Sequence, residues 1–411
     1  MAPVMRSGGR ESRARARTID EHLMETCDVL IVGGGPAGSS CAWKLRQAGL
    51  EVIVMDRALF PRDKVCAGWI TPQVIGDLDF DVADYRHGRT FQPITGFRTG
   101  LIGGPRELET VYDTPISFGI RRCEFDGYLL QRAGARLKVG TPVSSIRRRG
   151  ERWVVNDAVA AAMLVGAGGH FCPVARWLNP ATEGPAKGAA ATSRAPLVVA
   201  QEAEFPIEQS DAASWPVAPE IPELYFCRDL KGYGWCFRKE GYLNVGLGRL
   251  DHRSLPKATG DFVSFLEARH RVPRDVSWRW RGHAYLVAHP PRRRVLKAGV
   301  IVAGDAAGLA YPQSGEGIRP AIESGLIAAS TIIDANGDYS RERLEPYEAR
   351  LVERFGARSS LSLPSGPSMA GLSASLTLWL FELPWFVRHL LLDRWFLRAH
   401  EPQLVSSAAR N

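Results

Sequence analysis

A glycine-rich turn near the N-terminus constrains the fold more than any other feature of this sequence. Gly33, Gly35 and Gly38 lie between an apolar run at 27–32 and a helical pattern at 36–48. In a dinucleotide-binding turn the first glycine permits the tight bend, the second lets the backbone approach a pyrophosphate, and the third lets helix pack on strand. The spacing therefore predicts a βαβ unit that binds a dinucleotide, with its phosphates at the positive end of the helix.

An acidic residue follows at the position that this unit requires. Gly49 ends the predicted helix, residues 51–55 form a second apolar strand, and Asp56 comes directly after it. A carboxylate about twenty residues beyond the turn can accept hydrogen bonds from ribose hydroxyls. At this point FAD and NAD(P) both remain open.

A second cluster, almost three hundred residues later, favours FAD. Gly304 and Asp305 follow an apolar strand at 298–303, and Gly315, Glu316 and Gly317 precede a predicted helix at 317–335. An acid at a strand end can hold polyol hydroxyls, and a glycine-rich helix start can present backbone N–H groups to an electron-rich ring oxygen. A flavin has both features, in its ribityl chain and its ring O2.

The order of these elements predicts an α/β fold with more than one lobe. At 411 residues the chain is long for a single core. We expect a Rossmann-like FAD-binding domain, an inserted antiparallel-sheet substrate domain and a helical C-terminal segment. The expected boundaries are a disordered basic tail at 1–26, the FAD-binding domain at 27–190 and 291–340 with a loop-rich stretch at 57–122, the substrate domain at 191–290, and the C-terminal segment at 341–411.

Composition indicates a reduced, cytoplasmic setting. Much of the net charge of +8 falls in the N-terminal tail, which lacks aromatic residues and gives no reason to expect nucleic-acid binding. The seven cysteines show no metal-ligand spacing, and no apolar run reaches membrane-spanning length. The aromatic C-terminal segment, with Trp379, Trp385, Arg388 and Arg394, leaves peripheral membrane contact open.

Four segments resemble the geranylgeranyl reductase family, within the flavoprotein class that includes para-hydroxybenzoate hydroxylase-like enzymes and flavin-dependent halogenases. The stretches 304–308 and 315–318, with Pro312 and 324–325, are similar to the flavin motif of the family. The segment at 60–68 resembles a second motif, whose cysteine, here Cys66, lies beside the flavin ring. Ala67 stands where a glycine is usual.

Two further segments complete the resemblance. Arg122 with 125–126 resembles the segment whose arginine contacts FAD, and 232–237 resembles the aromatic segment that lines the substrate cavity. Motifs and resemblance together imply a catalytic set of Cys66, Tyr233 and Trp235. They imply a FAD-binding set of Gly33, Gly35, Pro36, Ala37, Gly38, Asp56, Arg57, Lys64, Cys66, Ala67, Gly68, Arg122, Val143, Gly168, Gly304, Asp305, Pro312, Gly315, Glu316, Gly317 and Ile318.

The sequence departs from the pattern of the family at two positions, Gly168 and Arg238. Gly168 stands where the class usually has an aspartate that supports pyridine-nucleotide use, so the electron donor is either NAD(P)H or a separate reductase or ferredoxin. Arg238 replaces the proline expected after the aromatic segment and is expected near the cavity mouth.

The leading hypothesis is a FAD-dependent reductase that transfers hydride to an apolar, isoprenoid-like or natural-product substrate. Cys66 would act as a proton donor or tune the flavin potential. The alternatives are a monooxygenase of the hydroxylase type, a halogenase, and a flavin electron-transfer protein without turnover. His170, His283 and His289 belong to no recognisable catalytic constellation and are expected to be structural.

Overall fold

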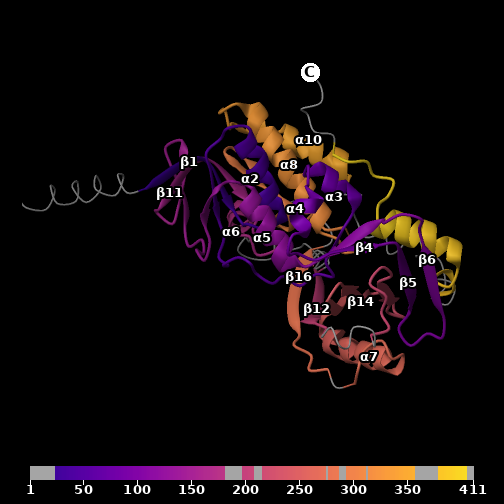
Figure 1. Ribbon diagram of the computed structural model, residues 1–411. Coiled ribbons are helices and arrows are strands. Elements are labelled where there is room, and N and C mark those ends of the chain that lie inside the picture. The colour runs from indigo at the N-terminus through magenta and orange to yellow at the C-terminus, as the bar shows by residue number, and fades with distance from the viewer. Residues whose placement is uncertain are drawn as a thin grey trace, which may run out of the picture.

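The computed structural model describes residues 24–180, 197–207, 215–274, 276–286, 293–311, 313–356 and 378–404. Two lobes are visible in Figure 1, one with a sheet between helices and one with a second sheet that carries helix α7 on its outer side. The predicted tail at 1–26 lies mostly outside the described residues. Its last part is ordered, because strand β1 (Glu25–Val32) already begins at Glu25, which pairs with Val159.

The first lobe is built on a largely parallel sheet. Its strand order is β17 (Leu296–Lys297), β18 (Val300–Val302), β11 (Val159–Gly166), β1, β2 (Val52–Met55) and β8 (Arg136–Lys138), and the hairpin of β9 (Ile146–Arg149) and β10 (Arg152–Val155) extends from β11. Residues 29–32 and 52–55 are buried on both faces, as continuous apolar strands of a parallel sheet must be. The βαβ unit predicted from the glycine turn is confirmed.

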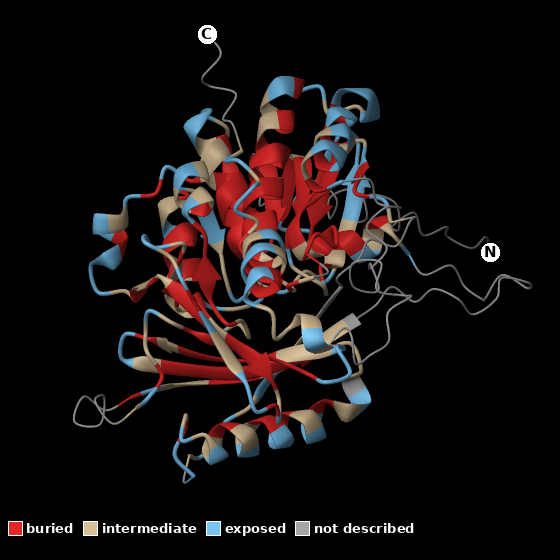
Figure 2. Ribbon diagram, turned by 90° about the vertical axis from the view of Figure 1, so that its right-hand side faces the viewer, coloured by how far each residue is buried: buried red, intermediate tan, exposed pale blue. Residues whose placement is uncertain are grey.

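Helices enclose this sheet, so that its strands form the buried interior in Figure 2. They are α2 (Pro36–Gln47), α5 (Arg122–Arg132), α6 (Pro173–Leu178), α8 (Ile318–Ala335), α9 (Arg341–Leu344) and α10 (Pro346–Phe355). Helices α2 and α8 pack side by side, and Gly325 permits the contact because a Cβ there would lie 2.2 Å from the carbonyl oxygen of Ala37. The sequence segments around 36 and 318 are thereby brought together.

The second lobe contains a seven-stranded sheet. Its order is β16 (Arg281–Leu286), β12 (Leu197–Pro206), β15 (Tyr242–Arg249), β14 (Gly232–Lys239), β13 (Glu223–Phe226), β5 (Gly96–Leu101) and β6 (Glu107–Val111). All neighbours are antiparallel except β13 and β5, which pair in parallel. The expectation that 57–122 is loop-rich and belongs to the first domain is wrong for β5 and β6, since both strands extend the sheet of the other lobe.

Residues 57–122 also form a small sheet of β3 (Trp69–Ile70), β7 (Ser117–Ile120) and β4 (Phe91–Ile94), with helices α3 (Pro72–Asp77) and α4 (Val82–Arg86) beside it. Residues of this unit share an apolar cluster with Ile318 and Ile322 of α8. The small sheet thus joins the two lobes next to the start of α8.

Helix α7 (Leu255–Ala268) follows the short turn η2 (His252–Ser254) inside the segment that was expected to be purely antiparallel sheet. Phe262 and Leu266 are buried against Tyr225, Leu243 and Leu247 of the sheet. Figure 2 shows the other face of α7 exposed, away from the sheet.

The C-terminal segment is helical, as predicted. Helix α12 (Pro384–Phe386) continues into η5 (Val387–Phe396), which is wound as a π-helix. Its residues Val387, Leu391, Leu392 and Phe396 are buried in a cluster with apolar residues of the second sheet. Among the helices of the described part of the chain, none is both long and apolar enough to cross a membrane.

Candidate cofactor and active site

A cavity of about 760 Å³ lies between the two lobes, and residues from both line it. The first lobe contributes the start of α2, Asp56 and the loop that precedes α8. The second lobe contributes Val199, Ala200, Tyr233, Trp235 and His283. A ligand in this cavity therefore contacts the glycine turn on one side and the second sheet on the other.

The glycine turn has the geometry that was inferred from its spacing. Gly33 has φ of 115°, and a Cβ there would lie 2.3 Å from the carbonyl oxygen of Ala167. A Cβ on Gly38 would lie 1.9 Å from the carbonyl oxygen of Gly33. Gly33 and Gly38 do not line the cavity, so their role is to close the turn against its neighbours.

Gly35 lines the cavity and is the N-cap residue of α2. No side chain caps this helix end, so its first backbone N–H groups are available to a ligand. An anion such as a pyrophosphate is favoured at this place by the helix dipole.

Asp56 follows β2 and also lines the cavity. Its two carboxylate oxygens accept hydrogen bonds from the backbone N–H of Gly34 at 2.7 Å and of Ala58 at 2.8 Å. These contacts hold the carboxylate beside the glycine turn. Its remaining lone pairs can accept hydrogen bonds from ribose hydroxyls.

The second glycine cluster meets the first across the cavity. Asp305 lies in the turn η3 (Gly304–Ala306), directly after β18. Gly317 leaves room for it, because a Cβ at Gly317 would lie 3.2 Å from Asp305 Oδ1. Gly317 is also the N-cap of α8, again without a side-chain cap, so a second set of helix N–H groups adjoins the cavity.

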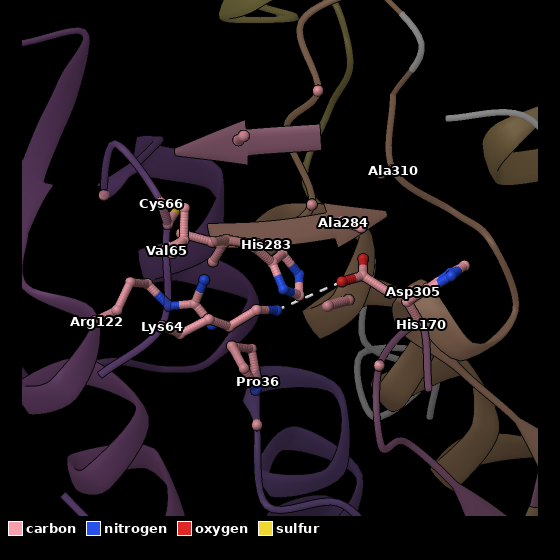
Figure 3. A pocket seen from close by; sticks show the side chains of 18 of the residues that line it. Pro36, Lys64, Val65, Cys66, Arg122, His170, His283, Ala284, Asp305 and Ala310 are labelled. Atoms are coloured by element: carbon pink, nitrogen blue, oxygen red, sulfur yellow. Dashed lines mark hydrogen bonds and ion pairs between the residues drawn. The ribbon is translucent and has the colours of Figure 1, made fainter. Parts of the chain in front are cut away.

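Lys64 reaches across the cavity to Asp305, with 3.4 Å between Nζ and Oδ2, as Figure 3 shows. Burial alone would raise the pKa of Asp305, but the positive charges of Lys64 and Arg122 outweigh this effect and hold the pKa below its ordinary value. The carboxylate is thus kept ionised, ready to accept hydrogen bonds from hydroxyls.

Cys66 lies on the loop that follows Lys64 and lines the same cavity. The side chain of Arg122 is within hydrogen-bonding reach of Cys66, and its guanidinium forms two 2.9 Å hydrogen bonds to the buried Asp126. Of the seven cysteines, only Cys66 and Cys123 are not fully buried. A thiol and a fixed cation therefore face the cavity together.

The wall opposite the glycine turns is mainly aromatic and apolar. Tyr233 and Trp235 lie on β14, and Trp69 of β3 adjoins them. The Tyr233 hydroxyl donates a 2.5 Å hydrogen bond to the carbonyl oxygen of Ser314, and Trp235 Nε1 donates at 2.6 Å to Asn244 Oδ1. The Tyr233 hydroxyl and the Trp235 indole N–H are thus engaged, while Trp69 Nε1 is buried without a hydrogen-bond partner in the described residues, and the wall offers mainly apolar ring atoms to a substrate.

Two of the three histidines that were expected to be structural lie at the cavity. His283 is on the edge strand β16, and His170 follows β11. Burial lowers the pKa of His283 to about 4, and burial also lowers the pKa of His170. Both are therefore neutral at pH 7. His289 lies outside the described residues.

Most residues predicted for the site line the cavity, and the exceptions have identifiable places. Val143 packs against the core of the first sheet, and Gly304 is a turn residue with φ of 62°. Arg238 was expected near the cavity mouth, but it lines neither this cavity nor the one beside it, and one of its contacts is with the carbonyl oxygen of Trp215. Pro312 lies outside the described residues. Sequence reasoning missed Trp69, Val199, Ala200 and Ala284, which have no local motif.

The residues present fit FAD. One cavity is lined by two helix N-termini without a side-chain cap, at Gly35 and Gly317, by two fixed carboxylates, and by a thiol and an aromatic wall. Gly33 and Gly38 close the turn behind it, where a Cβ would meet backbone atoms. The helix ends suit the pyrophosphate and ring oxygen, and the carboxylates suit ribose and ribityl hydroxyls.

Comparisons with known proteins agree with this geometry. Residues 28–96 match the family model described as FAD dependent oxidoreductase. A geranylgeranyl diphosphate reductase from Rhodobacter capsulatus is 30% identical, over 74% of this chain and 74% of the relative. A digeranylgeranylglycerophospholipid reductase from Methanosarcina acetivorans is 27% identical, over 83% and 84%.

A solved structure has the same fold. The geranylgeranyl bacteriochlorophyll reductase-like protein from Thermoplasma acidophilum superposes with a TM-score of 0.72 at 23% identity, covering 87% of this chain and 91% of that one. The predicted fold class, an α/β FAD-binding fold with an inserted sheet and a helical C-terminal segment, is confirmed.

Proposed function

Because this chain belongs to the geranylgeranyl reductase family of FAD-dependent oxidoreductases, we propose that it reduces carbon–carbon double bonds of a polyprenyl substrate. The observation that carries this proposal is the shared cavity, in which the FAD cradle, the Cys66 thiol and the aromatic wall face one another.

The comparisons support the substrate class. The two reductases named above act, by their names, on a diphosphate and on a glycerophospholipid, and both names contain the geranylgeranyl group. The polar head differs and the polyprenyl chain is common to both. An apolar wall of Trp69, Tyr233 and Trp235 suits the common part.

The residues of the chain have distinct tasks in the proposed reaction. Bound FAD, when reduced, supplies the hydride. Gly35, Asp56 and Asp305 hold the cofactor, the aromatic wall orients the chain and excludes water, and Cys66 donates the proton that the second carbon requires. Arg122, within hydrogen-bonding reach of Cys66, stabilises the thiolate left behind.

The experiment has two stages. Purified protein is reduced anaerobically with NADPH, NADH and reduced ferredoxin in turn, which identifies the electron donor. Geranylgeranyl diphosphate and a geranylgeranylated glycerophospholipid are then added, and mass spectrometry follows the gain of hydrogen. We expect saturation of the chain, at a rate that Cys66→Ala lowers by about 10²-fold or more. Rapid oxidation by O₂ with an oxygenated product would instead establish a monooxygenase.

We further propose that the C-terminal segment contacts a membrane surface, where such substrates reside. Trp379 and Trp385 are 52% and 66% exposed, while the same segment buries Phe386 and Val387. Exposed tryptophans with nearby Arg388 and Arg394 are suited to the interface of an anionic bilayer.

A further inference from the structure

We propose that Glu202 is a proton-relay residue, which carries protons from a second cavity to Cys66 during the reduction. This inference rests on the proposed function. It arises from a polar cluster that no motif predicted, buried between the Cys66 loop and the second sheet.

The second cavity, of about 420 Å³, adjoins the first. Both are lined by Asp63, Lys64, Cys66, Arg122 and Arg281. Cys66 therefore lies at the boundary between the two. Glu202 lines the second cavity only and is 6% exposed.

Glu202 is joined directly to the Cys66 loop. Its Oε2 accepts a 2.5 Å hydrogen bond from the backbone N–H of Cys66, and Asn244 Nδ2 lies 3.5 Å away. Its Oε1 accepts no hydrogen bond within the described residues, although the residue lines the cavity. The carboxyl group is thus fixed through one oxygen, while the other can hold a proton and exchange it with cavity water.

A second glutamate on the same strand serves as an internal comparison. Glu204 lies two residues further along β12, so both side chains point to the same face of the sheet. Glu204 accepts hydrogen bonds from Lys239 Nζ at 2.7 Å, Arg121 Nε at 3.0 Å and Asn244 Nδ2 at 3.0 Å. Glu202 accepts hydrogen bonds from the Cys66 N–H and Asn244, but from no cation among the described residues.

These different environments give the carboxyl groups of Glu202 and Glu204 different pKa values. Burial raises the pKa of Glu202 to about 7, although Lys239 and the Cys66 N–H oppose the rise. Burial acts the same way on Glu204, but Lys239, Asn244 and Arg121 lower its pKa to about 2. Two neighbouring carboxyl groups with such different pKa values divide naturally into a proton carrier and a fixed anion.

The charged groups around Glu202 are Lys239 on β14, Glu204 on its own strand, Arg281 on β16, and the other charged residues that line the second cavity, Asp63, Lys64, Arg121, Arg122 and Arg279. None of these cations forms an ion pair with Glu202 within the described residues. Glu202 thus keeps the ability to change its protonation near neutral pH.

The reduction consumes one proton for each double bond, so the site needs a source of protons. Each saturated double bond gains one hydride at one carbon and one proton at the other, and we take the proton from the Cys66 thiol. The resulting thiolate must regain a proton before the next turnover. Glu202 gives it, through water in the second cavity, and is itself reprotonated from that water.

The test compares Glu202→Gln with Glu204→Gln in the FAD-loaded protein. In the wild type we expect the rate of chain reduction to fall as pH rises through about 7, because Glu202 then loses its proton. Glu202→Gln should lower the rate by about 10²-fold and remove this pH dependence. Glu204→Gln should keep the pH dependence of the wild type, and Glu202→Asp should partly restore that pH dependence.

A spectroscopic measurement follows the protonation of Glu202 itself, without turnover. Difference infrared spectra along a pH titration should show a protonated carboxyl band that disappears near pH 7 in the wild type and in Glu204→Gln. The band should be missing from Glu202→Gln, and bands from other carboxyl groups cancel in the comparison of variants.

Two outcomes separate the hypotheses. If wild-type protein reduces polyprenyl chains and Glu202→Gln keeps the same pH dependence, the relay is overturned and the proposed function stands. If no polyprenyl chain is reduced, the proposed function fails, and the relay step fails with it even where the Glu202 band is present.

Discussion

The hydroxyl of Tyr233 donates a 2.5 Å hydrogen bond to the carbonyl oxygen of Ser314, and this bond joins the substrate wall to the loop that leads into α8. The loop carries Gly315 and Gly317, which line the cavity. A change on the second sheet can therefore alter how the first lobe holds its cofactor.

Tyr233→Phe should weaken FAD binding by about 3- to 10-fold, because one hydrogen bond that fixes the loop contributes about 1 kcal/mol. Fluorescence titration of the apoprotein with FAD measures the change. The matched control is Tyr112→Phe, whose hydroxyl bonds to Asp393 Oδ1 at 2.6 Å near the C-terminal helix. Equal FAD affinity in wild type and Tyr233→Phe would show that the bond does not position the loop.

The glycines of the turn should respond differently to alanine. At Gly35 a Cβ meets only the flexible end of Arg62, 3.2 Å away, so Gly35→Ala should fold normally yet lose FAD affinity by about tenfold or more. At Gly38 the Cβ would lie 1.9 Å from a backbone oxygen, so Gly38→Ala should lower the free energy of unfolding by about 1–3 kcal/mol.

Thermal unfolding and FAD content, measured on both variants, check this difference. Stoichiometric FAD in purified Gly35→Ala would contradict the assignment of the pyrophosphate site. An unfolding temperature for Gly38→Ala equal to that of the wild type would contradict the steric argument.

Local sequence patterns were enough to propose a cofactor site but not to predict the whole fold. The glycine turn, Asp56 and Asp305 are predictable because each depends on residues next to it. Strands β5 and β6 were missed because β5 is placed by pairing with β13, more than a hundred residues away, and β6 is placed by pairing with β5. Glu202 was missed for the same reason, since only the folded chain brings it to the Cys66 loop.

Helix α7 was also missed, although the sequence contains a helical pattern for it. Its buried residues Leu255, Thr259, Phe262 and Leu266 recur at helical spacing. The strand-like alternation of the segments on either side favoured an interpretation as sheet. Proline is well tolerated in the first turn of a helix, which is where Pro256 lies.

The proposed membrane contact predicts a specific loss. Replacing Trp379 and Trp385 with serine should reduce binding to vesicles that contain anionic phospholipid, while leaving thermal stability nearly unchanged because both side chains are exposed. Cosedimentation with vesicles measures binding. Phe171→Ser is the control, since Phe171 is also 52% exposed but lies beside the cavity in the first lobe. Undiminished cosedimentation of the double variant would remove the proposed contact.

Glu316 gives a prediction of how stability depends on pH. Both of its carboxylate oxygens are buried without a hydrogen-bond partner in the described residues, and burial raises its pKa to about 7, against the influence of Arg319 and Arg398. The folded state thus holds this proton more tightly than the unfolded state, where the pKa is about 4.5. Its stabilising contribution is complete below pH 4.5 and is lost as pH rises through 7.

Glu316→Gln stays neutral at every pH, so it should gain stability relative to wild type on going from pH 5 to pH 8, by on the order of 1–3 kcal/mol. Denaturant unfolding of the FAD-saturated protein at both pH values measures the difference. Glu353→Gln, at an exposed position of α10, should show no such gain. A wild-type stability that rises relative to Glu316→Gln between pH 5 and pH 8 would mean that the buried carboxylate is stabilised as an anion, by Arg319 or Arg398, and that the sign derived from its burial is wrong.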